Sequence, residues 1–200
     1  MTVSITRCFR RLSAAAVAVL ALLPASLPAA EAIEFRDARI EQQDETLIVS
    51  ADFGIELSAR VEEALGKGVP LFFNFEFELI RPRWYWFDEK PVELVQTYRL
   101  SYHALTRQYR LSAGTLYQSF SSLAEALRLL SRPRLPPIER ARVRAGESYV
   151  AAVRLRLDTN QLPKPFQLSA MTSRDWTLDS DWRRFPYRVE APAAGAGERK

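Results

Sequence analysis

Residues 71–79, with the sequence LFFNFEFEL, decide the fold class. In this stretch, phenylalanine at every second position alternates with Asn74, Glu76 and Glu78. Successive side chains of a strand point to opposite faces, so the pattern predicts a β-strand with one buried face and one polar face. We expect Phe75, at the centre of the apolar face, to lie in the core.

The same alternation recurs on both sides of this segment. It is found in residues 46–57, 92–102, 109–111, 149–157, 166–170 and 176–178. About eight short strands, without a regular alternation of strands and helices, favour an antiparallel all-β fold. We expect Leu100 and Val153, which occupy apolar positions of two of these segments, to share one core with Phe75.

Two short helices are predicted to interrupt the strands. Ser58 is placed to cap the first helix, and Ser122 with Glu125 forms a capping box for the second. The whole pattern predicts a single antiparallel β-sandwich, immunoglobulin-like in general architecture, with two short helices. We expect this domain to span residues 33–189 and the Ala-, Gly- and Pro-rich residues 190–200 to be a disordered tail.

The N-terminus has the order of a secretory signal peptide. Three arginines within residues 7–11 precede the apolar run 12–23, and small residues and prolines follow as far as Ala32. The apolar run is shorter than the roughly 20 residues that span a bilayer as a helix. We predict Sec-type export to the periplasm with cleavage after Ala32, and with Ala25 and Ala29 as alternative sites. The alternative is an uncleaved segment that anchors the chain in the inner membrane.

Removal of residues 1–32 as a signal peptide changes the composition of the chain. It removes Cys8, the only cysteine, and lowers the formal net charge from +4 to +2. A mature chain without cysteine has no disulfide and no cysteine-based zinc site. Because the protein is expected to be exported and nearly neutral, we do not expect nucleic acid to be its partner.

Several motifs together resemble one protein family. They are WYWFDE (84–89), YRLSY (98–102), RQYRLS (107–112), LSAM with a following DW (168–176), and WRRF (182–185). In this order they resemble an exported proteobacterial family, a domain of unknown function numbered 4390, over residues 33–188. The resemblance implies export from a Gram-negative cell and a single domain. Genes of such proteins can neighbour those of nitrogen-type sensor kinases, which implies a sensor kinase as one candidate partner. It implies no catalytic residue and no cofactor.

The sequence contains no recognisable catalytic or metal-binding motif. His103 is the only histidine, it falls on the outward face of its predicted strand, and no G-x-S-x-G nucleophile motif accompanies it. Asp88 and Glu89 are adjacent, so on a strand they would point to opposite faces and could not act together on one glycosidic bond. We read this pair and the segment 179–181 as turns. We expect no metal, no cofactor and no enzymatic activity; the alternative is a periplasmic hydrolase that uses loop carboxylates.

Five arginines are candidate residues for binding an anionic partner. They are Arg140, Arg142, Arg144, Arg154 and Arg156. The first three alternate with small or apolar residues, which predicts three guanidinium groups on one strand face, and the last two lie on the outer face of the next predicted strand. A hairpin would join them into one basic patch. Either Glu76 and Glu78 neutralise this patch from a neighbouring strand, or the patch binds an anionic partner.

The aromatic run at residues 84–87 is the second candidate surface. Alternation places Trp84 and Trp86 on one face and Tyr85 and Phe87 on the other. We expect at least one pair to plug an end of the core, and the other pair, if exposed, to form a contact patch. The sequence thus predicts an exported, non-enzymatic interaction module of the cell envelope whose partner is a protein or an anionic envelope surface.

Overall fold

The computed structural model describes residues 32–43, 45–85 and 87–190. The expected signal peptide, apart from Ala32, and the expected tail, apart from Glu190, lie outside the described residues. The described chain is mostly β, with two antiparallel sheets and three α-helices. None of its helices is both long enough and apolar enough to cross a membrane.

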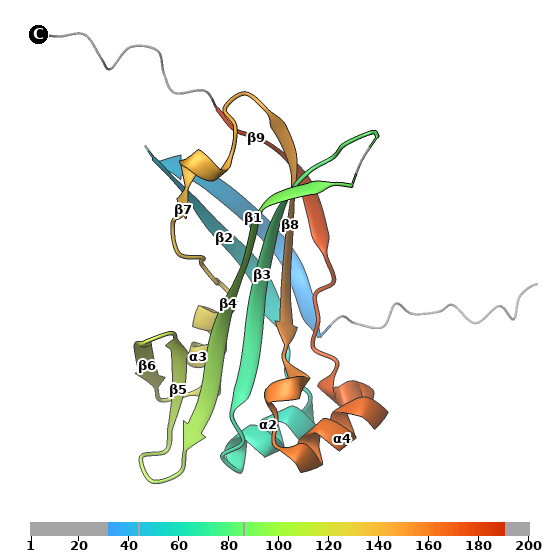
Figure 1. Cartoon of the computed structure of the whole chain (residues 1–200). Helices are drawn as coiled ribbons and strands as arrows, with labels where there is room; N and C mark the ends of the chain where they lie inside the picture. The colour runs from blue at the N-terminus through green and yellow to red at the C-terminus, as the bar shows by residue number, and fades with distance from the viewer. Residues whose placement is uncertain (1–31, 44, 86, 191–200) are drawn as a thin grey trace, which may run out of the picture. The chain divides into compact units, whose positions relative to one another are not determined.

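The larger sheet has the strand order β6-β5-β4-β3-β8-β9, and all neighbours are antiparallel (Figure 1). Its strands are β3 (Leu71–Arg81), β4 (Glu89–His103), β5 (Gln108–Ala113), β6 (Leu116–Phe120), β8 (Ser148–Leu157) and β9 (Arg183–Arg188). The strand that decides the fold in sequence, β3, lies inside this sheet between β4 and β8. Its alternating apolar face is therefore available to the core along its full length.

The smaller sheet has the order β1-β2-β7, with β1 at Ile33–Gln43, β2 at Thr46–Ile55 and β7 at Ile138–Glu139. Strand β1 was not predicted from the sequence. Its pairing with β2 shifts register at an irregularity between Phe35 and Asp37. Backbone hydrogen bonds extend the contact of β2 beyond the two residues of β7. The amide of Phe53 donates to the carbonyl of Ser131 at 2.8 Å, and the amide of Leu135 donates to the carbonyl of Val49 at 3.1 Å.

Side chains of both sheets meet in one buried cluster. Phe53 of the smaller sheet packs edge-on against Phe75 of the larger sheet, with ring centroids 6.0 Å apart. Phe75, Leu100 and Val153 are all fully buried in this cluster, which confirms the core predicted from the alternation.

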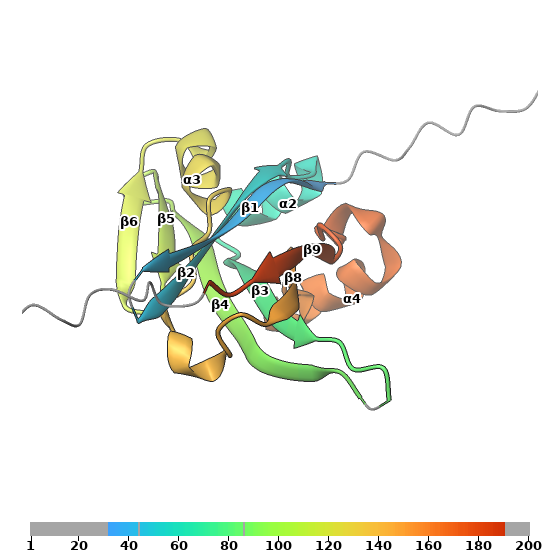
Figure 2. The same cartoon turned by 90° about the horizontal axis from the view of Figure 1, so that it is seen from above.

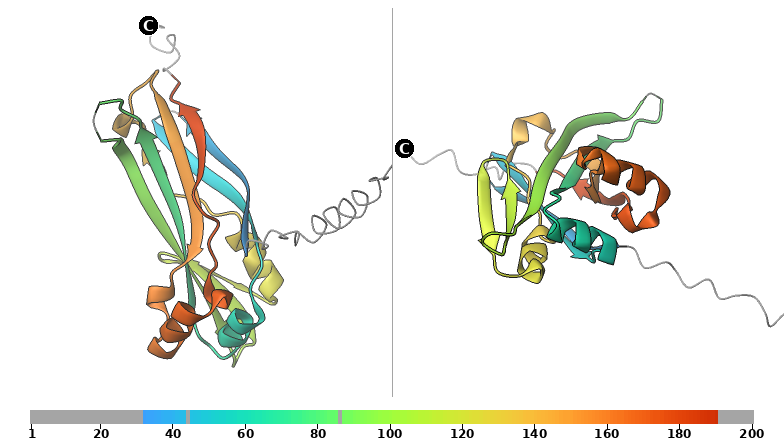
Figure 3. Two further views of the ribbon diagram at one scale, coloured as in Figure 1. Left: turned by 90° about the vertical axis from the view of Figure 1, so that its right-hand side faces the viewer. Right: turned by 90° about the horizontal axis from the view of Figure 1, so that it is seen from below.

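Two helices begin where their caps predicted. In α2 (Ala59–Gly66), the Ser58 hydroxyl accepts a hydrogen bond from the amide of Val61, and in α3 (Leu123–Leu130), the Ser122 hydroxyl accepts one from the amide of Glu125, each at 3.3 Å. Helix α3 packs against β5 and β6. Figure 3 shows α2 and the third helix, α4 (Lys164–Thr172), at the end of the large sheet opposite the β3–β4 loop.

The strand expected at residues 166–170 is wrong, because these residues belong to α4. Phe166 and Ala170 pack against the core while Leu168 between them is exposed, which is the four-residue spacing of a helix face. Pro165 in the first turn favours the helix start. The strand expected at 176–178 is also wrong: Trp176 ends the 3-10 helix η4 (Arg174–Trp176), where its ring packs 5.6 Å from that of Phe166.

Candidate interaction surfaces

The prediction that one strand carries Arg140, Arg142 and Arg144 is wrong. Residues 140–142 form a 3-10 helix, η2 (Arg140–Arg142), and Arg144 lies in the loop after it. The amide of Arg140 donates to the carbonyl of Glu45 at 2.8 Å, so the chain has reached the turn that precedes β2 and has no further residue of β2 to pair with. These arginines therefore do not share one strand face. Arg144 is exposed and lies 3.7 Å from the Glu147 carboxylate.

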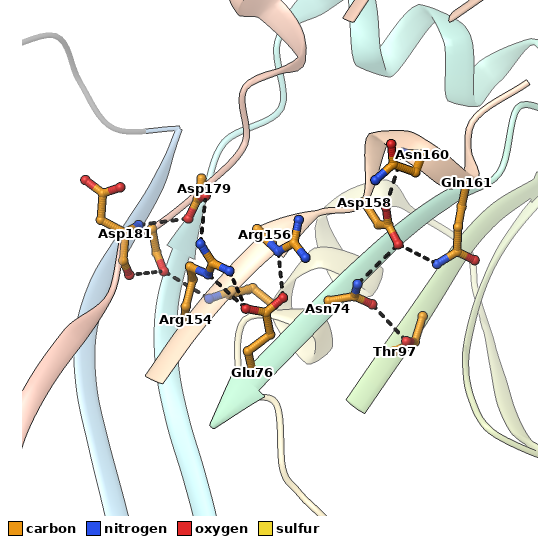
Figure 4. Close-up of polar contacts among 12 residues, drawn as sticks. Asn74, Glu76, Thr97, Arg154, Arg156, Asp158, Asn160, Gln161, Asp179 and Asp181 are labelled. Carbon is orange, nitrogen blue, oxygen red and sulfur yellow. Dashed lines mark hydrogen bonds and ion pairs between the residues drawn. The ribbon is translucent and has the colours of Figure 1, made fainter. Parts of the chain in front are cut away.

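Arg154 and Arg156 lie on the outer face of β8, as the alternation predicted, but they form no hairpin with residues 140–144. The neighbours of β8 are β3 and β9. Glu76 of β3 lies between the two arginines: its Oε2 accepts from Arg154 Nε at 3.0 Å and its Oε1 from Arg156 Nε at 2.6 Å (Figure 4). The alternative that acids of a neighbouring strand neutralise these arginines is therefore correct for Glu76. Glu76 is only 7% exposed.

Further contacts fix these two arginines. The Arg154 guanidinium lies 3.8 Å from the Asp179 carboxylate and 4.6 Å from the centre of the Trp182 ring. The hydrogen bond to Glu76 raises the pKa of Arg156, while burial raises the pKa of Asp179. Glu78, the second acid expected to neutralise the patch, instead binds Lys90 at 2.9 Å. The charges of Arg154 and Arg156 are thus paired within the domain.

A polar network continues this face toward α4. Asn74 Nδ2 donates to Asp158 Oδ2 at 3.3 Å, and Thr97 donates to Asn74 Oδ1 at 2.8 Å (Figure 4). Burial alone would raise the pKa of Asp158, but hydrogen bonds from Gln161, the amide of Asn160 and Asn74 outweigh it and lower the pKa. This network links β3, β4 and the segment 158–161 and stabilises their packing.

The aromatic run lies in the β3–β4 loop, residues 82–88, which projects from the sheet (Figure 2). Trp84, Tyr85 and Phe87 are 93%, 68% and 86% exposed, so the expectation that one pair plugs the core is wrong for these residues. Trp86 lies outside the described residues. The core cluster contains the buried side chains of Val143, Tyr149 and Val189, and not those of Trp84, Tyr85 or Phe87.

Ion pairs hold the base of this aromatic loop. Arg81 binds Glu89 at 3.3 Å and Glu147 at 2.9 Å, and Arg83 also binds Glu89. The amide of Arg83 donates to Asp88 Oδ1 at 3.3 Å, across the loop. Asp88 therefore lies in the connection between β3 and β4, as expected from the sequence, whereas Glu89, which was expected in the turn, is the first residue of β4 and pairs with Arg81.

Two adjoining grooves were not predicted. The first, of about 480 Å³, lies between the ends of β4, β5 and β6 and the end of α3, and the second, of about 400 Å³, lies over β1 and β2. Arg132 and Arg134 line both of them. The sequence marks this place only by an Arg-Pro-Arg triplet after a predicted helix, and the proline there reads as a helix stop.

Side chains suited to metal binding do not gather in the part of the chain that the structure describes. No cluster of three or more His, Cys, Asp and Glu side chains that could hold a metal ion occurs there. His103 is exposed at the end of β4. Segment 179–181 forms a turn, as expected, in which the amide of Asp181 donates to Asp179 Oδ1 at 2.9 Å.

Comparison with known proteins gives one match. The family model described as "Domain of unknown function (DUF4390)" matches residues 30–186. No curated protein and no solved structure matches the chain.

Proposed function

We propose that this chain, which belongs to the DUF4390 family, is a non-enzymatic interaction module of the cell envelope that contacts its partner through the aromatic loop 82–88. The observation that carries the proposal is the exposure of Trp84, Tyr85 and Phe87 on a loop whose base is held by ion pairs. Large rings bury much area on binding and lose little side-chain entropy, which is why aromatic residues are frequent among binding hot spots.

The ion pairs at the base of the loop support this role. A loop that is ordered before binding costs less conformational entropy when the complex forms. Arg81 is bound to two carboxylates, and its ion pair with Glu147 ties the loop to the segment that precedes β8. The base of the loop that carries the rings is thus held to the domain.

The partner that we propose is a protein of the envelope, and a sensor kinase is the first to test. An anionic envelope surface is the other class of partner. Arg142 and Arg144 support that second class because both are exposed. Arg154 and Arg156 support it less, because Glu76 occupies their guanidinium groups.

Export is part of the proposal. Residues 1–32 act as a Sec signal peptide that is cleaved after Ala32, and the mature domain works in the periplasm. An intact-mass measurement on a periplasmic extract tests this: the expected chain begins at Ile33. A full-length mass in the inner-membrane fraction would instead establish the anchored form.

We also propose that the two sheets are the halves of one immunoglobulin-like sandwich. The contact between Phe53 and Phe75 across the two sheets supports this arrangement. The alternative function, a hydrolase with loop carboxylates, lacks comparable support. Asp37 and Asp52 line one groove together, but Asp37 is bound to Arg39 and Asp52 to Arg132. Each carboxylate is therefore paired with an arginine.

The test uses the full chain in its native envelope. A photoreactive amino acid in place of Tyr85 should cross-link one envelope component, which is then identified by mass spectrometry. Replacing Trp84, Tyr85 and Phe87 together by Ala should abolish co-purification of that component. The matched control replaces Leu168 and Met171, which are exposed on α4, by Ala and should retain it. Equal recovery with the aromatic triple variant would contradict the proposal.

A further inference from the structure

The groove between α3 and the end of the large sheet is apolar and open to solvent. It is lined by Tyr98 of β4, Leu111 and Ala113 of β5, Leu116, Tyr117 and Gln118 of β6, Leu129 of α3, and Arg132 and Arg134 after it. Leu116 and Leu129 are 77% and 44% exposed, whereas the Tyr117 ring is stacked by the Arg110 guanidinium at 4.7 Å. Apolar side chains that line a groove and remain this exposed mark a place where another apolar group can be buried.

The groove runs beside a free sheet edge. Strand β6 ends the order of the large sheet, and its only neighbour there is β5 (Figure 2). Ala113 and Leu116 flank the two-residue turn, where Gly114 has a φ of 58°. In an antiparallel pair, the N–H and C=O groups of successive residues point alternately toward the neighbouring strand and away from it. Counted from Leu116 beside the turn, the backbone groups of Tyr117 and Ser119 point away from β5, to the free edge.

The wall of the groove carries basic charge. Arg36, Arg39, Arg132 and Arg134 line the adjoining groove, together with only two acids, Asp37 and Asp52. Arg132 is 3.4 Å from Asp52, whereas no carboxylate of the described residues lies within ion-pair distance of Arg134. A carboxylate of a ligand would therefore meet an arginine that no acid of the described domain occupies.

The backbone of Arg134 is held in place at this wall. The Tyr98 hydroxyl donates to the carbonyl of Arg134 and accepts from its amide, each at 2.9 Å. The segment is further fixed on β2 by the bond from the amide of Ala51 to the carbonyl of Pro133 at 3.2 Å. The guanidinium thus projects from a fixed backbone beside the apolar groove.

We propose that this groove binds an extended peptide segment of a partner protein that carries apolar and acidic side chains on one face. The segment adds to the edge of β6. Because side chains two residues apart share a face of a strand, its apolar side chains enter the groove beside Leu116 and Leu129, and its carboxylates on the same face bind Arg134 and Arg132. A free lipid chain fits less well, because this open groove would bury less of it than a closed pocket does and a lipid makes no use of strand backbone groups. This site is separate from the aromatic loop, and its test is independent of the proposed function.

The test is a titration of the mature chain with a fluorescent peptide of about ten residues, which is long enough to span β6. Valine and glutamate occupy every second position in turn, so that they share one face, and serine occupies the other face. The matched probes replace every glutamate by lysine or every valine by serine. We expect only the valine–glutamate peptide to bind, and its binding to weaken as salt is raised. Arg134→Glu should weaken it by about tenfold or more, and Leu116→Ser and Ser119→Pro should each weaken it as well. Arg128→Glu, an exposed arginine of α3 outside the groove, is the control and should bind as the parent does.

Three outcomes would overturn the proposal. One is binding of the valine–lysine peptide with equal affinity. Another is binding of oleate to the groove without binding of any peptide, which would assign the site to a lipid. The third is a dimer in light scattering that is lost in Ser119→Pro, which would assign the edge of β6 to a second copy of the chain. The aromatic triple variant should bind the peptide as the parent does, so that failure at one site is distinguishable from failure at the other.

Discussion

Glu76 and Arg154 are directly opposite each other in the register of β3 and β8, and Arg154 Nε donates to Glu76 Oε2 at 3.0 Å. The same carboxylate also accepts from Arg156, so one nearly buried acid serves two arginines. Glu76 alternates along β3 with the phenylalanines of the core. The strand therefore stabilises the domain by apolar contact on one face and by ion pairs on the other.

The first prediction concerns this shared carboxylate. Glu76→Gln should lower the free energy of unfolding by about 2 to 4 kcal/mol, because Arg154 and Arg156 lose their common partner in a mostly buried place. Glu93→Gln is the matched control on the same face of the sheet; Glu93 is exposed, and its change should stay within about 0.5 kcal/mol. Urea unfolding measures both. Equal effects of the two variants would show that the Glu76 pairs contribute little.

The second prediction concerns the two classes of phenylalanine. Phe75→Ala should cost about 3 to 5 kcal/mol, because the ring is fully buried between the two sheets. Phe87→Ala should change stability by less than about 0.5 kcal/mol, because that side chain is exposed in the aromatic loop. Denaturant unfolding followed by fluorescence distinguishes them. A large loss of stability in Phe87→Ala would mean that the loop packs on the domain.

Much of the fold is predictable from the sequence because two local signals agree with the tertiary structure. Alternation in residues 71–79 matches a strand with one face on the core, and Ser58 and Ser122 cap helices where they are expected. The same signal fails at Phe166 and Ala170, since residues four apart share a face in a helix as well as in a strand. Strand β1 has charged or polar residues on both faces, so its pairing with β2 leaves little local pattern.

The candidate surfaces are less predictable, because they depend on where strands end. Alternation cannot show that pairing along β2 stops before Arg140, and so it extends a strand through residues that form η2. It places Arg154 beside acids correctly, but the choice of Glu76 over Glu78 depends on the register of β3 and β8, in which Glu76 is opposite Arg154 and Glu78 is opposite Ala152. The groove near Arg134 combines residues from five segments, and no local pattern contains that information.

The third prediction concerns pH. Hydrogen bonds lower the pKa of Asp158 in the folded state below its ordinary value of 3.8, so folding favours the ionised carboxylate. Its contribution to stability is full above that value and is lost as the pH falls through the lower folded-state pKa. Asp158→Asn should therefore cost about 0.5 to 1 kcal/mol at neutral pH, because asparagine keeps the cap and loses the charge, and progressively less below pH 3.8. Urea unfolding of parent and variant at pH 7 and at about pH 3 tests this, and an equal difference at both would contradict it.

The last prediction compares the two serine caps. Ser122 caps α3 only, whereas the Ser58 hydroxyl both accepts from the amide of Val61 and donates to the carbonyl of Asp175 at 2.9 Å. Ser58 thus joins the start of α2 to η4, where Arg60 also binds Asp175 at 3.0 Å. Ser122→Ala should cost about 1 kcal/mol, as is usual for a lost cap, and Ser58→Ala about 1 kcal/mol more, because a second hydrogen bond is lost.

Ser58→Thr is the control for this comparison, since threonine keeps the hydroxyl and also caps helices. It should restore most of the stability that Ser58→Ala loses. Hydrogen exchange gives the second measurement: in Ser58→Ala the amides of both α2 and η4 should exchange faster, because the hydroxyl joins the two segments. In Ser122→Ala the faster exchange should stay within α3. If Ser58→Ala loses no more stability than Ser122→Ala and leaves exchange in η4 unchanged, the bond to Asp175 contributes nothing to the contact between α2 and η4.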